Sequence, residues 1–473
     1  MIFSKKGLIK WVFLSIIVIV LVGCGQESSS RGQDIDINLE GMPIVDETIT
    51  MTFLAPSAPT PDWNDVLIFN EYEKISNIHI DWQMVSRDGI QERTNISLGT
   101  GDYPDAFHSA NISSADLQRY GEQGIFIRLN DLIEEYAPNL NALLEEYPEI
   151  KKGITMPDGN IYSFPTIYDP TYNTLLMNWK LWLNSEFLKE LEMEEPTTIE
   201  EFYDYLVAVK ENNPTGNGQY NEVPLQANGD GNLINIMKGS FGLGTRGISH
   251  VYVDADPETG LPRFMPTTDA YKEMLQFLNK LYEEELLNQD LYTVKSEQAQ
   301  AKGKEGLIGA VVTTNPGTGY GLDYYVGSPT LVGPNGDRLY SNFVSSMKNV
   351  GAFVITDNNP YPEATVRWID YFYSDEGMRL FFMGKEGETY YVDEDGEYVY
   401  TDEIENNPDG LTRPEAISKY LTWRTGNYPT MVVEKYFKTP TEPAEKVKDD
   451  IPEEVWPPFN FDEEELEVMT STG

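Results

Sequence analysis

The chain has 473 residues and a formal net charge of −43, from 34 lysines and arginines against 77 aspartates and glutamates. Nucleic acids and anionic lipid headgroups bind proteins largely through Lys and Arg, so this composition argues against either as a partner. A chain of this length exceeds one ordinary hydrophobic core and predicts two domains.

The N-terminus has the order of a secretory signal. Three lysines precede an apolar run over residues 11–23, and the only cysteine, Cys24, follows at once. The alternative is a transmembrane anchor, but the run is shorter than the ~20 apolar residues that span a bilayer. Residues 21–24 (LVGC) resemble the bacterial lipobox. The resemblance implies that residues 1–23 are a lipoprotein signal peptide and that Cys24 is the lipidation site.

Residues 24–45 are rich in Ser, Gly, Gln and Asp and show no apolar period, which predicts a flexible tether. Folded sequence is expected from about residue 46, because Ile49, Met51 and Phe53 alternate with threonines as in a strand. Cleavage before Cys24 removes three lysines and no acidic residue, which changes the net charge from −43 to −46.

Further along, short apolar strands alternate with amphipathic helices, the pattern of an α/β fold. The segment NDLIEEYAPNLNALLEEYPEI predicts two short helices broken at Pro138, and DGNIYSFP predicts a turn and then a strand that ends at Pro165. In EEPTTIEEFYDYLVAVKENNP, Thr198 and Glu201 have the spacing of a helix capping box. A buried strand, a turn and a helix over about 362–373 come later.

The order of these motifs resembles family 1 extracellular solute-binding lipoproteins, the LipO-like receptors of Gram-positive ABC importers and distant relatives of maltose-binding protein. The segment YFYSDEGMRLFFMGKEGETYYVDEDGEYVY adds to the resemblance, which covers nearly all of the mature chain. It implies a two-lobed, periplasmic-binding-protein-like α/β fold of type II, with a ligand cleft between the lobes.

The resemblance also implies about three crossings of the chain between the lobes. Carried onto this sequence, they fall near residues 165–168, 331–337 and 374–377. The first lobe would then contain residues 46–166 plus 337–373, and the second lobe residues 167–330 plus 374–473. Proline and glycine residues at the first and last of these positions suit a hinge that absorbs backbone rotation.

Signatures of catalysis are missing from the sequence. His79, His108 and His250 are widely separated, and there is no zinc helix motif, nucleophile elbow or Walker A loop. The segment GLGTRG at 242–247 matches Gly-x-Gly-x-x-Gly, but it follows a predicted helix and is interpreted as a glycine-rich loop. The chain is therefore expected not to be an enzyme. The many carboxylates keep glycoside hydrolysis open as an alternative.

One loop, NPTGNGQYNE, has the spacing of a calcium site, with oxygen-bearing side chains at positions one, three, five and nine. Relatives such as alginate-binding proteins hold calcium in a loop of this form with aspartates at positions one and nine. Both positions are asparagine here, so the site is predicted to be weak or vestigial, and calcium is not expected to be required. The alternative is a plain Asn/Gly turn that caps the preceding helix. The candidate ligands are Asn213, Thr215, Asn217, Gln219, Asn221 and Glu222.

Aromatic residues are frequent in the predicted loops. Sugars present apolar faces and rims of hydroxyls, which suit aromatic rings flanked by Asp, Asn and Arg, and open α/β sheets bind ligands at loops after strand ends. The alternative is that these rings are ordinary core residues. The candidate ligand contacts are Asp62, Trp63, Tyr103, Asp105, Tyr168, Tyr172, Asn315, Tyr320, Tyr325, Trp423 and Arg424.

Together these features predict a monomeric receptor, lipid-anchored through Cys24 on the extracytoplasmic face of the cell membrane. It would capture a carbohydrate, above all an oligosaccharide, by cleft closure and pass it to ABC permease subunits. A polysaccharide-acting enzyme and a ligand-sensing partner of a membrane receptor are the two alternatives.

Overall fold

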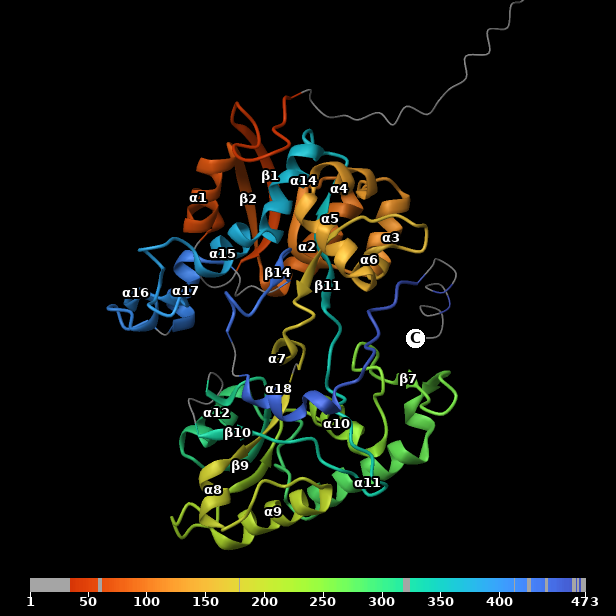
Figure 1. Cartoon of the computed structure of the whole chain (residues 1–473), viewed down its shortest axis with the longest axis vertical. Helices are drawn as coiled ribbons and strands as arrows, with labels where there is room; N and C mark the ends of the chain where they lie inside the picture. Colours follow the sequence, from red (N-terminus) through yellow and green to blue (C-terminus); the bar gives the residue numbers. More distant parts are fainter. Residues whose placement is uncertain are drawn as a thin grey trace, which may run out of the picture.

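The computed structural model describes residues 35–57, 62–177, 179–317, 324–411, 413–422, 427–438 and 441–461, together with residues 465 and 468. These residues form two α/β lobes, one above the other in Figure 1. Cys24, Tyr320, Trp423 and Arg424 lie outside the described residues. Within the described ranges, each helix is too short or too polar to cross a lipid bilayer.

The first lobe, at the top of Figure 1, contains a six-stranded sheet in the order β14-β4-β11-β3-β1-β2. Only β11 runs against its neighbours, because β1, β2, β3, β4 and β14 are all mutually parallel. The carboxyl ends of these parallel strands therefore share one edge. The strands are β1 (Ile49–Ser57), β2 (Ile78–Ser86), β3 (Ala106–Ile112), β4 (Phe164–Tyr168), β11 (Met347–Ile355) and β14 (Met431–Val432).

Helices cover this sheet. The predicted break at Pro138 is confirmed, and Pro138 and Pro148 begin two successive helices because proline fits the first helical turn. The strand predicted to end at Pro165 instead extends from Phe164 to Tyr168. The helices are α1 (Leu67–Ser76), α2 (Ile90–Thr100), α3 (Ser114–Glu122), α4 (Asn130–Tyr136), α5 (Pro138–Glu146), α6 (Pro148–Ile154), α14 (Pro362–Asp370), α15 (Asp375–Met383), α16 (Asp402–Glu405) and α17 (Arg413–Tyr420).

The second lobe contains a four-stranded sheet in the order β10-β5-β9-β6, in which β6 and β9 are parallel and β5 is antiparallel to β9 and β10. Its elements are β5 (Lys180–Asn184), β6 (Val223–Gln226), β9 (Ile308–Thr313), β10 (Tyr325–Gly327), α8 (Ser185–Glu190), α9 (Ile199–Asn212), α10 (Gly231–Met237), α11 (Asp269–Glu283), α12 (Ser296–Lys304) and α18 (Glu442–Val447). Two small hairpins, β7 (Val253–Ala255) with β8 (Pro262–Phe264) and β12 (Tyr390–Val392) with β13 (Tyr398–Tyr400), complete the strands of the described residues.

The predicted capping box at the start of α9 is present. The Thr198 hydroxyl accepts a hydrogen bond from the Glu201 amide (3.1 Å), and the Glu201 carboxylate accepts one from the Thr198 amide (3.2 Å). Ile199, Phe202, Leu206 and Val209 form one apolar face of the helix and are buried in the core of the second lobe. Local sequence signals therefore fixed this helix correctly.

The expected lobe boundaries are wrong for the last quarter of the chain. Met378, Phe382 and Tyr428 are buried in the core of the first lobe, and β14 joins the sheet of that lobe beside β4. Residues 375–437 thus belong to the first lobe, because their large apolar side chains pack there. Ser374 is not at a crossing; its hydroxyl accepts a hydrogen bond from the Gly377 amide and caps α15.

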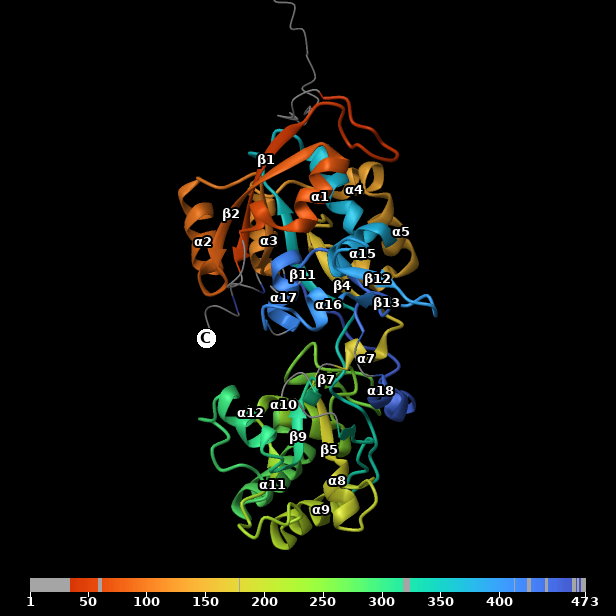
Figure 2. The ribbon, with the colours of Figure 1, turned by 90° about the vertical axis from the view of Figure 1, so that its left-hand side faces the viewer.

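The crossings between the lobes are correspondingly different. The first follows Tyr168, as expected, and continues through α7 (Asn173–Leu176). The second lies at 344–346 instead of 331–337, since Leu331 is buried in the core of the second lobe. A third crossing separates Phe437, which packs against the core of the first lobe, from α18, which contacts β10 of the second lobe. The first two crossings are adjacent, because the Tyr168 amide donates to the Ser346 carbonyl (2.7 Å). Figure 2 shows α7 and α18 on one side of the space between the lobes.

An aromatic cluster surrounds His108 in the core of the first lobe. The imidazole is 5.4 Å from the Trp63 ring, 5.3 Å from Trp82 and 5.8 Å from Phe353, measured between ring centroids. Burial lowers the pKa of His108 to about 3. The folded protein therefore keeps this histidine neutral at pH values where an unfolded chain would protonate it.

We expect this histidine to make the protein sensitive to acid. An unfolded histidine takes up a proton near pH 6.5 and folded His108 does not, so stability is lost as the pH falls below 6.5. Between pH 7 and pH 5 the free energy of unfolding should fall by about 2 kcal/mol more in the wild type than in His108→Phe. Urea denaturation followed by tryptophan fluorescence measures this difference. Equal pH dependence in His108→Phe and the wild type would contradict the assignment.

Candidate functional site

In each lobe, the sheet edge that holds the carboxyl ends of the parallel strands faces the space between the lobes. In the first lobe this is the edge where β4 ends and the chain leaves for α7. In the second lobe, Thr313 at the end of β9 pairs with Lys180 at the start of β5, directly after the first crossing. The carboxyl ends of parallel strands thus meet across the cleft from both sides. Loops at such ends are the usual ligand-binding positions of open α/β sheets.

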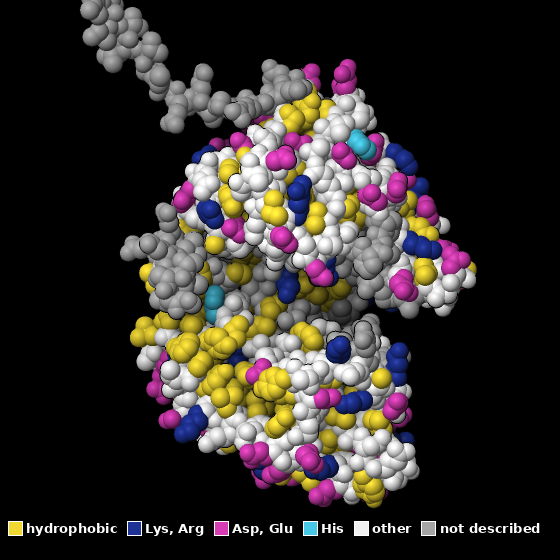
Figure 3. Space-filling model, turned by 180° about the vertical axis from the view of Figure 1, so that it is seen from behind, with side chains coloured by type: hydrophobic (Ala, Val, Ile, Leu, Met, Phe, Trp, Pro, Cys, Tyr) yellow, Lys and Arg dark blue, Asp and Glu magenta, His cyan; other side chains and the backbone are white. Residues whose placement is uncertain are grey.

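A cavity of about 1360 Å³ lies between the lobes. Figure 3 shows the molecule hollowed there. The first lobe contributes α6 and the turn after it, the crossings contribute α7 and residues 343–346, and a C-terminal segment provides a third wall. Acidic, basic and uncharged polar side chains line the cavity, including Glu149, Lys151, Lys152 and Asn173. A cavity of this size exceeds that of a typical drug-sized ligand site.

The third wall is a segment that we name the C-terminal strap, residues 451–461. On the second lobe, the Phe459 ring stacks on His250 with centroids 3.5 Å apart, and the Trp456 amide donates to the Arg246 carbonyl (3.3 Å). On the first lobe, the Asn460 amide nitrogen donates to the carbonyls of Gly153 (2.7 Å) and Thr155 (3.1 Å). The strap therefore joins the two lobes in addition to the three crossings.

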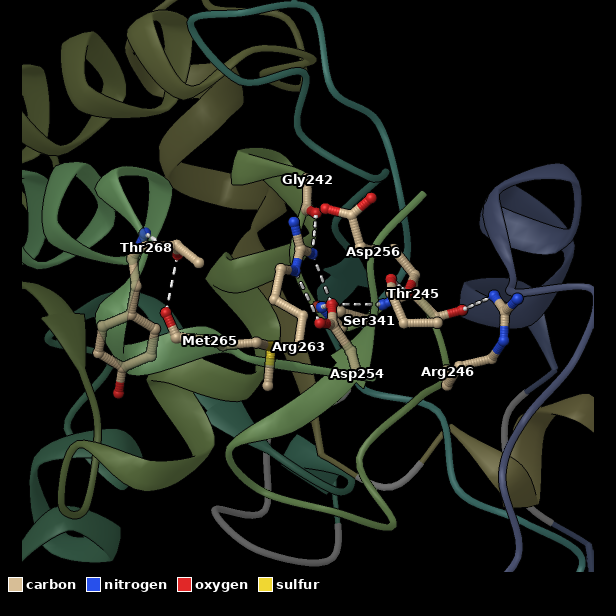
Figure 4. Close-up of polar contacts among 12 residues, drawn as sticks. Gly242, Thr245, Arg246, Asp254, Asp256, Arg263, Met265, Thr268 and Ser341 are labelled. Carbon is tan, nitrogen blue, oxygen red and sulfur yellow. Dashed lines mark hydrogen bonds and ion pairs between the residues drawn. The ribbon is translucent and has the colours of Figure 1, made fainter. Parts of the chain in front are cut away.

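A buried ion pair organises the loop that receives the strap (Figure 4). The Arg263 guanidinium donates to both carboxylate oxygens of Asp254 (2.9 and 2.8 Å) and to the Gly242 carbonyl (3.0 Å). Asp254 is completely buried and also accepts from the Gly244 amide (2.8 Å). Thr245 and Arg246 follow directly, and the Arg246 guanidinium pairs with Glu454 of the strap (3.5 Å).

The segment GLGTRG is thus a structural loop. Gly244 has φ +77°, and a Cβ there would lie 2.8 Å from the Lys238 side chain, so both backbone and space require glycine. Its amides bind a carboxylate of the same chain. The interpretation as a glycine-rich loop is confirmed.

Trp63 was predicted to contact ligand, and this is wrong. Its side chain is only 3% exposed and packs edge-on against Trp82, with ring centroids 4.9 Å apart. The residue directly follows Asp62, which is exposed and caps the short helical turn that contains Trp63. The turn after β1 therefore presents Asp62 to solvent and inserts Trp63 into the core.

Tyr103 and Asp105 lie at the opposite edge of the first sheet. They precede β3, whereas the cleft edge follows it. The Asp105 carboxylate accepts from the Thr52 amide (2.7 Å), and the Tyr103 hydroxyl donates to Asp357 (2.7 Å). Both side chains are thus occupied in structural contacts away from the cleft.

The prediction that Tyr325 contacts the ligand is wrong for a similar reason. It is buried, pairs with Asn184 at the far end of β5, and donates its hydroxyl to the Ile308 carbonyl (2.5 Å). The strand β10 begins at the edge remote from the cleft because it is antiparallel to β5. Tyr325 follows β9 closely in the sequence, and this position did not indicate that the chain runs back to the remote edge before β10 begins.

Three predicted contacts do lie where the lobes meet. Tyr168 ends β4, and burial raises the pKa of its hydroxyl. Tyr172 is buried on the first crossing, and Asn315 follows β9, with its side-chain oxygen accepting from the Gly317 amide (2.8 Å). The structure therefore brings these three residues, together with the exposed Asp62 after β1, to the cleft side of the two sheets.

Sequence reasoning missed the strap and the end of α6. The strap sequence IPEEVWPPFNF has no helical or strand period, so it resembles a disordered tail. Its one signal is the density of aromatic residues and prolines, which is unusual for a flexible terminus.

The predicted calcium loop forms a compact turn at the far edge of the second sheet, between α9 and β6. Asn213 caps α9 in the left-handed conformation (φ 48°), as the plain-turn alternative requires. Its amide, with the nitrogen directed inward, donates to Glu222 Oε1 (2.8 Å), Asn217 Oδ1 (2.9 Å) and Thr215 Oγ1 (3.2 Å). Three side-chain oxygens thus converge on the Asn213 amide nitrogen.

Glu222 supplies the only carboxylate of this loop. It is 9% exposed, and its Oε2 atom is buried without a hydrogen bond. A hard cation prefers such oxygens, so the residues fit calcium, although one carboxylate is little charge for a divalent ion. Neither this loop nor any other described part of the chain has a group of three or more His, Cys, Asp or Glu that could hold a metal ion.

Similarity to known proteins covers most of the chain. Residues 58–379 match the family model for bacterial extracellular solute-binding proteins. The chain is 33% identical over 378 residues to the fructooligosaccharide ABC transporter substrate-binding protein FusA of Streptococcus pneumoniae, covering 78% of this chain and 68% of that protein. It is 23% identical over 433 residues to lipoprotein LipO of Bacillus subtilis, covering 87% and 78%.

Solved structures agree in fold. The FusA structure in complex with kestose superposes with a TM-score of 0.72 at 26% identity, over 89% of this chain and 88% of that chain. A second FusA structure, an EF-hand mutant in complex with fructo-nystose, gives the same TM-score and coverage. The predicted two-lobed fold is confirmed.

Proposed function

This chain belongs to the family of bacterial extracellular solute-binding proteins, and we propose that it captures an oligosaccharide between its lobes for an ABC transporter. The similarity to FusA over both lobes carries the proposal. The family is one of solute-binding proteins, so we expect binding without catalysis. The protein would act as a monomer and deliver the sugar to permease subunits.

Closure of the cleft is the step that the geometry supports. The crossings are short and two of them are hydrogen bonded to each other, so they can act as a common hinge between two separately packed cores. A ligand in the interlobe cavity contacts both lobes fully only when they close. It therefore binds the closed form more tightly and increases its population.

We expect saturable binding without chemistry. Titration with a panel of oligosaccharides should change tryptophan fluorescence, and chromatography should recover the sugar intact. Solution scattering at saturating ligand should give a smaller radius of gyration than the free protein. Products of hydrolysis would support the enzyme alternative, and an unchanged radius of gyration would indicate a rigid pocket in one lobe.

The lipid anchor is part of the proposal. Residues 1–23 have the basic start and apolar run of a secretory signal peptide, and Cys24 follows directly. The similar protein LipO is named a lipoprotein. A lipid on Cys24 would hold the lobes on the extracytoplasmic face of the membrane, with residues 24–45 as the tether.

Cys24→Ser should therefore either accumulate unprocessed in the membrane or appear as soluble protein, because a serine hydroxyl does not replace the thiol as lipid acceptor. Cell fractionation with metabolic labelling by a fatty acid measures both outcomes. A processed Cys24→Ser variant that stays in the membrane would disprove the lipobox assignment.

We further propose that the loop at 213–222 is a weak calcium site that does not contact the sugar. The unpaired Glu222 Oε2 atom supports it, as does the EF-hand of FusA. To serve as a ligand, Asn213 would turn its amide oxygen inward in place of the nitrogen that now donates to the loop oxygens. The loop lies at the sheet edge remote from the cleft, so an ion there would stabilise the second lobe and take no part in sugar contact.

With one carboxylate, a dissociation constant of about 1 mM is expected, the weak end of the EF-hand range. Calcium at 10 mM should then stabilise the protein by about 1.4 kcal/mol relative to a chelator, which differential scanning fluorimetry would detect as about 2 °C. Glu222→Gln should abolish the response, and Asn213→Asp with Asn221→Asp should strengthen it. An equal response in Glu222→Gln, or none in the wild type, would contradict the site.

A further inference from the structure

Exposed aromatic side chains gather on one part of the second lobe. Tyr252 and Phe264 are each 53% exposed and Tyr292 is 72% exposed, so all three rings offer most of a face to solvent. Half-buried Tyr271 lies in the first turn of α11 beside them. We name these four residues the aromatic rim.

Two contacts and the electrostatic surroundings of Tyr271 link the members of the rim. The rings of Tyr252 and Phe264 meet edge to face, with centroids 6.3 Å apart. Burial is the main cause that raises the pKa of the Tyr271 hydroxyl. Tyr252 and Asp230 also raise this pKa, so these two residues lie within electrostatic range of Tyr271. The Tyr292 hydroxyl donates to Asp230 Oδ2 (3.3 Å). A carboxylate thus stands among the tyrosines.

The rim lies beside the cleft. Asp230 follows the carboxyl end of β6, and the Gly229 amide donates to the Leu291 carbonyl (2.9 Å), which holds Tyr292 at the same edge. On the other side, Tyr252 follows His250, which stacks on Phe459 of the strap. Figure 3 shows hydrophobic side chains collected on the second lobe beside the hollow.

The rim is also held rigid. The buried Asp254–Arg263 ion pair ties β7 to β8, the hairpin whose ends carry Tyr252 and Phe264. The Met265 amide donates to the Tyr252 carbonyl (2.8 Å) and closes the same hairpin. Rings fixed before binding lose little conformational entropy when a ligand covers them.

The chemistry of the cluster selects a class of sugar. Aromatic faces suit the apolar CH face of a sugar ring, and Asp230 accepts hydrogen bonds from hydroxyls. A uronate would place its carboxylate near Asp230 on a chain with a net charge of −43, and like charges repel. We propose that the aromatic rim with Asp230 is the sugar-contacting surface of the second lobe and selects uncharged oligosaccharides over uronate oligomers. The inference rests on the proposed function.

The test begins with the wild-type mature chain and a defined panel: kestose, nystose, cellotriose, xylotriose, diacetylchitobiose and trigalacturonate. Isothermal titration calorimetry identifies the best ligand, which we expect to be uncharged. Tyr292→Ala and Tyr252→Ala should each weaken it about tenfold or more, by analogy with losses at aromatic stacking platforms. Tyr220→Ala is the matched control, because Tyr220 is 64% exposed on the same lobe but at the edge remote from the cleft.

Two further variants separate the contributions. Tyr292→Phe keeps the ring and removes the bond to Asp230, so its loss should be smaller than that of Tyr292→Ala. Asp230→Asn should raise the affinity for trigalacturonate relative to the wild type. Unchanged thermal midpoints in these variants would exclude a general loss of folding.

The outcomes distinguish this inference from the proposed function. Binding of no sugar by the wild type would overturn the proposed function, and the rim assignment with it. Wild-type binding that Tyr292→Ala and Tyr252→Ala retain as fully as Tyr220→Ala would overturn the rim assignment alone and indicate a protein-docking surface. Trigalacturonate as the best ligand would overturn the selection for uncharged sugars.

Discussion

The direction of the strands is the constraint on which the rest of this structure depends. Five strands of the first sheet are parallel, and β6 and β9 are parallel in the second, so each lobe has one edge of carboxyl ends. The two edges face each other across the cleft. This polarity decides which loops can reach a ligand, and it places the loop at 213–222 on the remote edge, where an ion can only stabilise the fold.

The sequence predicted the features that depend on nearby residues. The capping box of α9, the break at Pro138 and the two-lobed fold were all correct. Distant packing was harder to predict. Trp63 follows a cleft-edge strand but turns into the core, and residues 375–437 return to the first lobe because their apolar side chains complete its core. The Asp254–Arg263 ion pair joins two strands of a hairpin, and the sequence alone did not show that these two side chains would meet.

Two kinds of acidic residue serve different purposes in this chain. Most of the acidic side chains among the described residues lie outside the cores and give the surface its charge. Asp254 is instead buried, where it binds a guanidinium and the backbone of a glycine-rich loop. Removing its partner would leave an unpaired charge in the interior, which is strongly destabilising. The same pair fixes the loop that receives the strap, so cleft geometry on that side depends on it.

The strap also gives the cavity a direction. It blocks one flank by joining Gly153 of the first lobe to His250 of the second. A glycan held between the lobes would meet this segment on that flank. The strap therefore limits how far a ligand bound in this cavity can extend on that side.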